Sequence, residues 1–518
     1  MFIRYITKMS EYILTIGLEI HIKLKSEHKM FCQCKNEQNF GIERSNDWDH
    51  KNGWNHEIEL MPRYNLVPNT NICPVCTGQP GALPTLSEDV LEKALLLGKV
   101  LNCTINEIST FDRKSYFYPD LPMGYQITQL YHPTNTQGQV SFFLENYTNE
   151  KTIHIQDAHM ENDTGKMIHD GGQAMIDFNR AGTPLVEIVT LPDFGTTEEV
   201  VEFLKELQRM VRYNNIADAD LEKWQMRVDV NVSVRRSEQD PLGTRVEVKN
   251  INSFGMIKRA IEHEQARQEK LYEAGEIFTQ QTRGRDDTKG ESYLMRSKED
   301  ALDYRYFPEP DLPPLKIDNN RRQRLNQQKI TIPHNIIKQF SQEYRFNKEY
   351  INALISDKLV LDYFFTTLSH CEEWNDKAIL SKLIVKRLSW PIAARTKENF
   401  TTIDQLKFSH EQFKEFLSKA QAGSLIENQL KILMDEMLST GKNPEEIIKE
   451  KWFDIPAIDE KELEGIIQQV LIDNPSIVEQ YKWGKTTTMG FFIGQLMKKT
   501  WGKTSPKIAQ EIFEKLLK

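Results

Sequence analysis

The sequence is poor in cysteine and contains no long apolar run, and these absences exclude two classes of protein. Six cysteines among 518 residues are too few for a disulfide-stabilised scaffold. No stretch approaches the roughly 18 consecutive apolar residues of a membrane-spanning helix. Residues 1–10 also lack the apolar core and cleavage site of a secretory signal, and mitochondrial presequences are normally longer. We therefore expect a cytoplasmic protein, with an organellar location as the alternative that the sequence leaves open.

An excess of positive charge is absent as well. The 66 Lys and Arg and the 75 Asp and Glu residues give a formal net charge of −9, which excludes a general nucleic-acid coat but allows a local basic surface. The chain has no Walker phosphate-binding loop, no His-Glu-x-x-His motif and no glycine-rich amidase stretch with a tandem serine. With 39% hydrophobic and 27% charged residues, the composition is that of an ordinary globular protein of about three domains.

The cysteines that are present form a pattern. Cys32 and Cys34 are separated by one residue, and Cys73 and Cys76 by two. Two such pairs far apart in the sequence are typical of a zinc site with four thiolate ligands, with buried or redox-active thiols as the alternative. A zinc ion there would hold the long polar loop of residues 35–71.

The balance of strand and helix patterns changes along the chain. Residues 1–331 alternate strand patterns with few helices, which predicts an α+β domain with a largely antiparallel sheet. Strand signals nearly vanish after the Pro-rich stretch 308–314, so we expect a helical domain over 332–406 and a helical tail domain over 407–518, with a linker at 396–404. The expected strands include 125–131, 140–145, 152–156, 174–180 and 184–189, and the expected helices include 87–101, 197–213 and 257–274.

The strand expected at residues 13–24 has two different faces. Its apolar residues alternate with polar ones, so that Glu19 and His21 lie side by side on the polar face and Gly17 leaves room beside them. A carboxylate and an imidazole on a rigid strand could form half of a metal site. The alternative is the solvent-facing side of an antiparallel sheet.

Other expected strands repeat this arrangement of carboxylates beside cations. The residues concerned are Arg227 and Asp229 in 225–236, Arg245 and Glu247 in 244–249, Glu187 in the apolar run 184–189, and the alternating His159, Glu161 and Asp163. A lone carboxylate in an apolar run must find a cation or strong donors, because burying it unpaired costs several kcal/mol. Mg²⁺ prefers oxygen ligands and is commonly shared with nucleotide phosphates, which Arg and Lys would hold. The pattern therefore indicates a metal–nucleotide site on the sheet.

Two further segments combine aromatic and basic residues. Residues 111–122 include Arg113, Lys114 and Tyr118, and such a segment can stack on bases and meet phosphates, or simply be a structured loop. Residues 481–510 contain six lysines and no Asp or Glu, which makes them a candidate contact with an RNA backbone. The lysines that we expect to contact RNA are Lys482, Lys485, Lys498, Lys499 and Lys503.

These segments together resemble a known family, the B subunits of the tRNA-dependent aspartyl/glutamyl amidotransferases. The resemblance covers essentially the full chain. It is carried by residues 17–21 (GLEIH), 73–76 (CPVC), 81–84 (GALP), 111–122, 179–182 (NRAG), 184–189 (PLVEIV), 249–254 (KNINSF), 295–298 (MRSK), 303–311 (DYRYFPEPD) and 494–498 (GQLMK).

The resemblance implies a glutamine-synthetase-like cradle domain, a helical domain and a helical tail that meets tRNA. It also implies a carbon–nitrogen ligase that uses ATP to phosphorylate the side-chain carboxylate of Glu-tRNA(Gln) or Asp-tRNA(Asn), and then amidates it. Ammonia would come from glutamine through an amidase partner, the family's A subunit, with a small C subunit in the same complex. The absence of an amidase motif in this chain agrees with that division.

Carried over by position, the family's magnesium ligands and catalytic residues would be Glu19, His21, Glu161, Glu187 and Glu247. Phosphate-binding or supporting roles would fall to Arg227, Asp229 and Arg245, and the cysteine quartet resembles a zinc site that only some members have. This chain departs from the family pattern in two places. Asn162 stands where a second acid is usual, and Glu222-Lys223-Trp224 replaces a Glu-Glu-Gly stretch.

Two other functions remain as alternatives. A glutamine-synthetase-like ligase acting on a free carboxylic acid would explain the carboxylates but not the basic, aromatic tail. A catalytically idle tRNA-binding protein would explain the tail but not the carboxylates.

Overall fold

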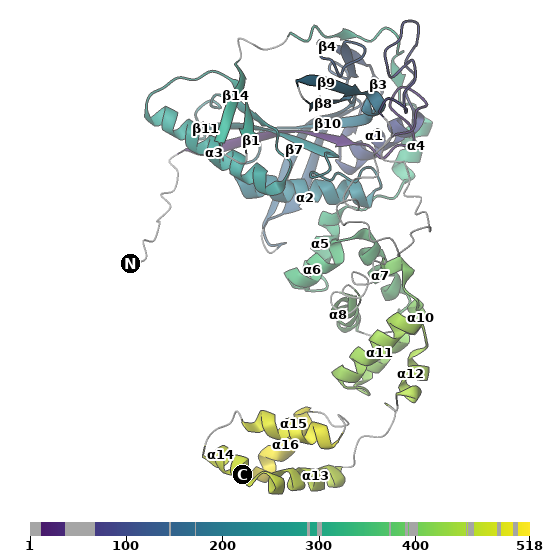
Figure 1. The fold of residues 1–518 in the computed structure, drawn as a ribbon, viewed down its shortest axis with the longest axis vertical. Coiled ribbons are helices and arrows are strands. Elements are labelled where there is room, and N and C mark those ends of the chain that lie inside the picture. Colours follow the sequence, from purple (N-terminus) through teal and green to yellow (C-terminus); the bar gives the residue numbers. More distant parts are fainter. Residues whose placement is uncertain are drawn as a thin grey trace. The chain divides into compact units, whose positions relative to one another are not determined.

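The computed structural model describes residues 12–36, 68–144, 147–170, 172–286, 291–297, 303–371, 374, 376–388, 392, 402–451, 453, 460–483, 488–500 and 506–517. The chain divides into two compact units, Met1–Glu343 and Tyr344–Lys518 (Figure 1). The finer division at 331/332 and 406/407 stays a prediction. Residues 1–10 and most of the expected linker lie outside the described residues.

A mixed sheet of nine strands forms the centre of the first unit. Its order is β14-β13-β12-β11-β1-β10-β7-β6-β2, and every pairing is antiparallel except that of β12 with β13. These two strands run parallel because helix α3 carries the chain back across the sheet between them. The strands are β1 (Ile13–Lys23), β2 (Thr104–Ile105), β6 (Asn135–Phe143), β7 (Glu150–Asn162), β10 (Pro184–Thr190), β11 (Met226–Arg235), β12 (Val246–Lys249), β13 (Gln281–Asp286) and β14 (Glu291–Ser297).

One face of this sheet packs against helices. Helices α1 (Glu88–Val100), α2 (Thr197–Tyr213) and α3 (Phe254–Glu273) contact its strands (Figure 1). The apolar row of β1, from Leu14 to Ile22, is buried in the shared core. This leaves the polar row of β1 on the opposite face, as the alternation of the sequence predicts.

The element boundaries confirm the main sequence-based expectations and correct several details. Helix α2 matches the expected 197–213, whereas α3 begins three residues early because the Ser253 side chain accepts a hydrogen bond from Met256 N and caps it. Strand β7 begins two residues before the expected 152–156 and ends six residues after it. The strand expected at 174–180 ends at Asp177, whose side chain accepts from Asn179 N and starts a turn.

Smaller elements complete the first unit. One small sheet joins β4 (Asp112–Ser115), β5 (Tyr125–Thr128) and β15 (Phe307–Pro308), a second joins β3 (Ile108–Ser109) and β16 (Leu315–Lys316), and a hairpin joins β8 (Lys166–Asp170) and β9 (Gln173–Asp177). A 3₁₀ turn, η3 (Phe178–Arg180), follows β9, and helices α4 (Asn319–Gln327) and α5 (Pro333–Gln342) close the unit.

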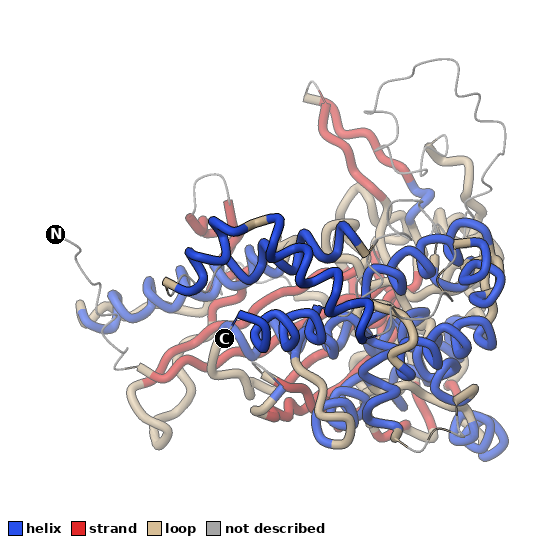
Figure 2. Tube along the Cα trace, turned by 90° about the horizontal axis from the view of Figure 1, so that it is seen from below, coloured by secondary structure: helices blue, strands red, loops and turns tan. Residues whose placement is uncertain are grey.

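The described residues of the second unit contain only helices and turns, so all the strands drawn in red belong to the first unit (Figure 2). The α+β class and the helical C-terminal region are thus confirmed. None of the described helices is long and apolar enough to cross a membrane. The elements are α6 (Lys348–Ile355), α7 (Lys358–Ser369), α8 (Lys377–Arg387), η5 (Ile403–Gln405), α10 (His410–Ala422), α11 (Glu427–Thr440), α12 (Pro444–Glu450), α13 (Glu460–Asp473), α14 (Pro475–Lys482), α15 (Met489–Lys499) and α16 (Pro506–Leu517).

Candidate functional site

The polar row of β1 forms the middle of a site on the open face of the sheet. Glu19 is paired with Asp229 of β11, and His21 is paired with Glu187 of β10. Directly paired residues of neighbouring strands project from the same face, so the register gathers these side chains. They line a cavity of about 690 Å³, in which every one of the five expected magnesium ligands lies.

His21, Glu161 and Glu187 form the first group of candidate metal ligands. Their nearest ligand atoms all lie within 4.8 Å of one another. His21 Nε2 is 3.3 Å from Glu187 Oε2 and 3.8 Å from Glu161 Oε1. Gln126 Nε2 donates to Glu161 at 3.0 Å and Lys114 Nζ lies 3.4 Å from it, so the position of this carboxylate is fixed from outside the group.

Glu19, Asp229 and Glu247 form the second group, again within 4.8 Å of one another. Lys249 Nζ lies 2.6 Å from Asp229 and 2.9 Å from Glu247, and it neutralises part of their charge. Burial raises the pKa of Glu19, and the charges of Glu187 and Glu247 add to that shift. Although burial opposes it, Lys249 holds the pKa of Glu247 below its usual value. The structure therefore separates the five expected ligands into two groups and adds Asp229, expected as a supporting residue, to the second.

His159 is a residue of this site to which the sequence assigned no role. Its Nδ1 atom is 2.7 Å from Asp157 Oδ1, and its Nε2 atom is 3.3 Å from Glu187 Oε2. Although burial opposes it, hydrogen bonds to Asp157 and Glu187 raise the pKa of His159 to about 10. The alternation of His159 with Glu161 was visible in the sequence. Its contact with Glu187 depends on the pairing of β7 with β10, which local patterns do not reveal.

The two arginines expected to bind phosphate differ in whether a carboxylate already pairs with them. Arg227 is paired with the buried Asp163 at 3.2 Å, and with Arg180 it holds the pKa of Asp163 well below its usual range although burial opposes this. Arg245 lines the same cavity and is exposed, and no ion pair joins it to a carboxylate among the described residues. Arg245 is therefore a cation of the cavity whose charge is available to a bound anion.

Two of the expected substrate-binding residues do not line the cavity. Arg113 makes a two-pronged ion pair with Glu309, at 2.7 and 2.9 Å, and also lies 3.1 Å from Asp311. Its guanidinium carbon is 4.2 Å from the centre of the Tyr125 ring. Tyr118 is exposed and absent from the cavity lining, whereas Lys114 is part of it.

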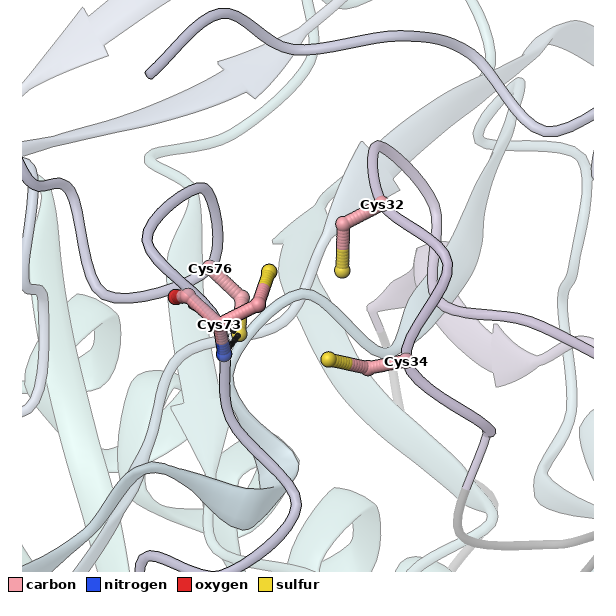
Figure 3. A group of neighbouring side chains, drawn as sticks. All are labelled: Cys32, Cys34, Cys73 and Cys76. Atoms are coloured by element: carbon pink, nitrogen blue, oxygen red, sulfur yellow. Dashed lines mark hydrogen bonds between the residues drawn. The ribbon is translucent and has the colours of Figure 1, made fainter. Parts of the chain in front are cut away.

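The four cysteines of the sequence pattern come together from two loops. Figure 3 shows the sulfurs of Cys32 and Cys34 facing those of Cys73 and Cys76, and all four lie within 4.8 Å of one another. A hydrogen bond with Cys32 and the charge of Lys29 lower the pKa of Cys76 to about 5. Four convergent sulfurs fit the donor set of a structural zinc ion. Most of the loop between the two pairs, residues 37–67, lies outside the described residues.

The expected RNA-contacting lysines are described only in part. Lys482, Lys498 and Lys499 are exposed, and Lys499 pairs with Asp473. Lys485 and Lys503 lie outside the described residues. Helix α15 buries Met489, Phe492 and Leu496 in a core shared with α13 and α16, which leaves its basic end on the surface.

Comparison with known proteins places the chain in a family. A model of the GatB/GatE catalytic domain matches residues 14–323, and a model of the GatB domain matches residues 369–517. Relatives from Persephonella marina, Thermosipho melanesiensis and Ruminiclostridium cellulolyticum are 38%, 37% and 36% identical. The alignments cover 98%, 97% and 97% of this chain and 100%, 98% and 96% of the relatives, each of which is named as the B subunit of an aspartyl/glutamyl-tRNA(Asn/Gln) amidotransferase. The expected resemblance is confirmed, and the chain belongs to the family of these amidotransferase B subunits.

Proposed function

We propose that this chain is the component of a tRNA-dependent, glutamine-hydrolysing amidotransferase that carries out both the kinase and the amidation steps. ATP phosphorylates the side-chain carboxylate of Glu-tRNA(Gln) or Asp-tRNA(Asn), and ammonia then displaces the phosphate to leave the amide. The observation that carries the proposal is the pair of carboxylate groups, His21/Glu161/Glu187 and Glu19/Asp229/Glu247, on one wall of a single cavity.

Each carboxylate group fits a divalent cation. Mg²⁺ takes carboxylate oxygens and retains several waters, and each group offers several such oxygens in a partly open cavity. The residues that would hold Mg²⁺ are Glu19, His21, Glu161, Glu187, Asp229 and Glu247. A bound cation would supply neutralisation of the charge that develops on the transferred phosphoryl group.

Other residues of the cavity would bind phosphate and reduce the repulsion of an anionic substrate. Arg245, whose charge is not engaged by a described carboxylate, would hold phosphate oxygens. Lys114 and Lys249 already contact the two carboxylate groups, so they limit the repulsion between an anionic substrate and the site. Because the cavity is only partly open, an acyl phosphate formed in it would be partly shielded from bulk water, which favours attack by ammonia over hydrolysis.

The finer architecture belongs to the same proposal. The first unit would be a glutamine-synthetase-like cradle over 1–331, followed by a helical domain over 332–406 and a tRNA-contacting tail over 407–518. The exposed Lys482 and Lys498 support the tail assignment. An amidase partner (the family's A subunit) would supply ammonia within a cytoplasmic complex that also holds a small C subunit, and the four cysteines would hold a structural zinc ion.

The test is amide formation by the reconstituted complex. The chain would be mixed with the amidase partner, the small C subunit, ATP, Mg²⁺, glutamine and either Glu-tRNA(Gln) or Asp-tRNA(Asn), with free glutamate as a third substrate. Glu19→Ala removes a carboxylate of the cavity, and Glu262→Ala, at an exposed position of α3, is the matched control. A parallel reaction with ammonium chloride in place of glutamine tests this chain independently of the amidase.

We expect ATP-dependent amide on tRNA that is abolished by Glu19→Ala and retained by Glu262→Ala. Amide formed only on free glutamate would establish the small-molecule ligase instead. Binding of tRNA with no amide from either nitrogen source, in a complex whose glutaminase is active, would leave a tRNA-binding protein without catalysis.

A further inference from the structure

A tryptophan at the catalytic cavity has a backbone conformation that is unfavourable for its side chain. Trp224 has a φ of 57°, in the left-handed region. A bulky residue there is an outlier, and such conformations persist only where the surrounding structure imposes them.

The turn that contains Trp224 is fixed by its neighbours. Asp220 Oδ1 accepts from the backbone N–H groups of Glu222 and Lys223, at 3.0 and 3.4 Å, and Asp220 O accepts from Gln225 N at 2.9 Å. Leu221 O accepts from Trp224 N at 3.2 Å. These bonds involve no side-chain atom of Trp224, so the indole is not needed to form the turn.

The indole also contributes little to the core. Trp224 is 47% exposed, whereas Leu221 and Met226 on either side of it are buried. Among the described residues, no aromatic ring or cation packs on the Trp224 ring. Trp224 instead lines the cavity of the two carboxylate groups, where its indole offers a flat apolar surface among charged residues.

The register places this ring at one end of the cavity. Met226 pairs with Ile22 and Arg227 with His21, so Trp224 lies just beyond the strand ends that carry the first carboxylate group. Arg245 precedes Val246, which pairs with Val232, so it lies toward the opposite end of β11. From Met226, where β11 begins, to the position opposite Arg245 the strand advances about seven residues, or roughly 23 Å. The cation that suits a polyphosphate and the ring that suits a base are therefore well separated.

We propose that Trp224 stacks on an adenine base at this end of the cavity. The inference rests on the proposed function, in which adenine has two sources: ATP and the 3′-terminal adenosine that carries the aminoacyl group. Aromatic side chains stack on bases because both present flat π-faces. The separation from Arg245 favours the terminal adenosine.

The test compares a substitution that removes the ring with one that keeps an aromatic ring. Trp224→Asn tolerates a positive φ and removes the ring, whereas Trp224→Tyr keeps a ring. Ile277→Asn, at a position that is 98% exposed in the same unit, is the control. Dissociation constants would be measured on the assembled complex, without turnover, for a non-hydrolysable ATP analogue, for uncharged tRNA and for tRNA that lacks its terminal adenosine.

We expect Trp224→Asn to weaken binding of one adenine-bearing ligand by roughly tenfold and Trp224→Tyr to retain most of that binding. The melting temperature of Trp224→Asn should be no lower than that of the unaltered chain, because Asn accommodates the positive φ of this position. A loss confined to intact tRNA, with no further loss for tRNA lacking the terminal adenosine, assigns the ring to that nucleotide. A loss confined to the ATP analogue assigns it to ATP. Unchanged constants for both ligands would overturn the stacking proposal, and amide formation by the same preparation would show that the proposed function still holds.

Discussion

The ammonium nitrogen of Lys29 lies 3.7 Å from the sulfur of Cys76, and the Lys29 side chain is fully buried. Its other partners are the carbonyl oxygens of Asn71 and Phe178, at 2.9 and 3.4 Å. A buried ammonium group is costly unless a negative charge compensates it. Among the described residues no carboxylate forms an ion pair with Lys29, so the cysteine cluster is the group that can supply the compensating charge, as thiolates held by a metal ion would.

Replacing Lys29 should therefore weaken metal binding. We expect Lys29→Met to release zinc to a chromogenic chelator roughly ten times faster than the unaltered chain, in the range found for groups that support metal ligands. Lys99→Met is the matched control, since Lys99 also donates to backbone carbonyls, of Leu325 and Gln328, but lies outside the cysteine cluster. Equal release rates for the two variants would contradict the role of Lys29.

Replacing a cysteine should remove the zinc altogether. Cys73→Ser takes one of four sulfurs from the cluster, and we expect metal analysis to find zinc in the unaltered chain and none in the variant. Limited proteolysis should then cut within residues 35–71 faster in the variant, because the ends of that segment lose their crosslink. Absence of zinc from the unaltered chain, purified without chelators, would remove the zinc assignment.

The two carboxylate groups should bind cations independently. Mn²⁺ can replace Mg²⁺ as a spectroscopic probe of oxygen ligands, and we expect two ions per chain at saturation. Glu161→Gln should lose the ion of the first group and Glu247→Gln that of the second, each with a fall in amide formation of roughly 10² to 10³-fold. The measurement is Mn²⁺ titration followed by electron paramagnetic resonance. Loss of both ions in either variant would show that the groups form one site.

The exposed lysines of the tail should contribute to tRNA binding through charge. Exchange of Lys482 and Lys498 for Glu should weaken tRNA binding and lower the slope of log K against log salt by about one for each phosphate that is no longer bound. Lys431→Glu, at an exposed position of α11, is the control. An unchanged slope would argue against the tail as an RNA-binding element. A deletion that tests the same point should remove the whole of Tyr344–Lys518, because these residues form one compact unit.

Cys103 should react slowly at neutral pH. Burial, assisted by the charge of Asp157, raises the pKa of its thiol to about 12, and only the thiolate is nucleophilic. The rate of alkylation at Cys103, followed by mass spectrometry, should therefore rise steadily up to about pH 10 without a plateau. A plateau near the ordinary thiol pKa of about 8.5 would mean that the thiol is not shielded.

The sequence predicted the faces of single strands well, because side-chain alternation is a local property of the chain. Glu19 with His21, and Asp229 with Arg227, project from β1 and β11 as expected. The grouping of these residues was not predictable, since it depends on strand order and register between segments far apart in the chain. Glu19 thus joins Asp229 rather than its neighbour His21.

Arg113 illustrates the same limit for loops. Its surroundings of aromatic and basic residues indicated a substrate-binding segment, yet its guanidinium group is held by Glu309, almost two hundred residues further along the chain. Nothing near Arg113 in the sequence identifies that partner. The sequence showed His159 only as part of an alternating pattern, because its contact with Glu187 arises only when β7 and β10 pair.

Strand β1 carries a consequence for how this protein can change over evolutionary time. The side chains that fill its interior and those that face its chemistry alternate along the same eleven residues. An insertion of one residue between Gly17 and Glu19 would exchange the buried and the cavity-facing side chains in the rest of the strand. An acidic side chain would then enter the hydrophobic core, and an isoleucine would face the cavity. We therefore expect β1 to tolerate substitutions more readily than insertions or deletions. Cation binding by a purified sample would therefore also report that β1 is paired with its neighbours in the correct register.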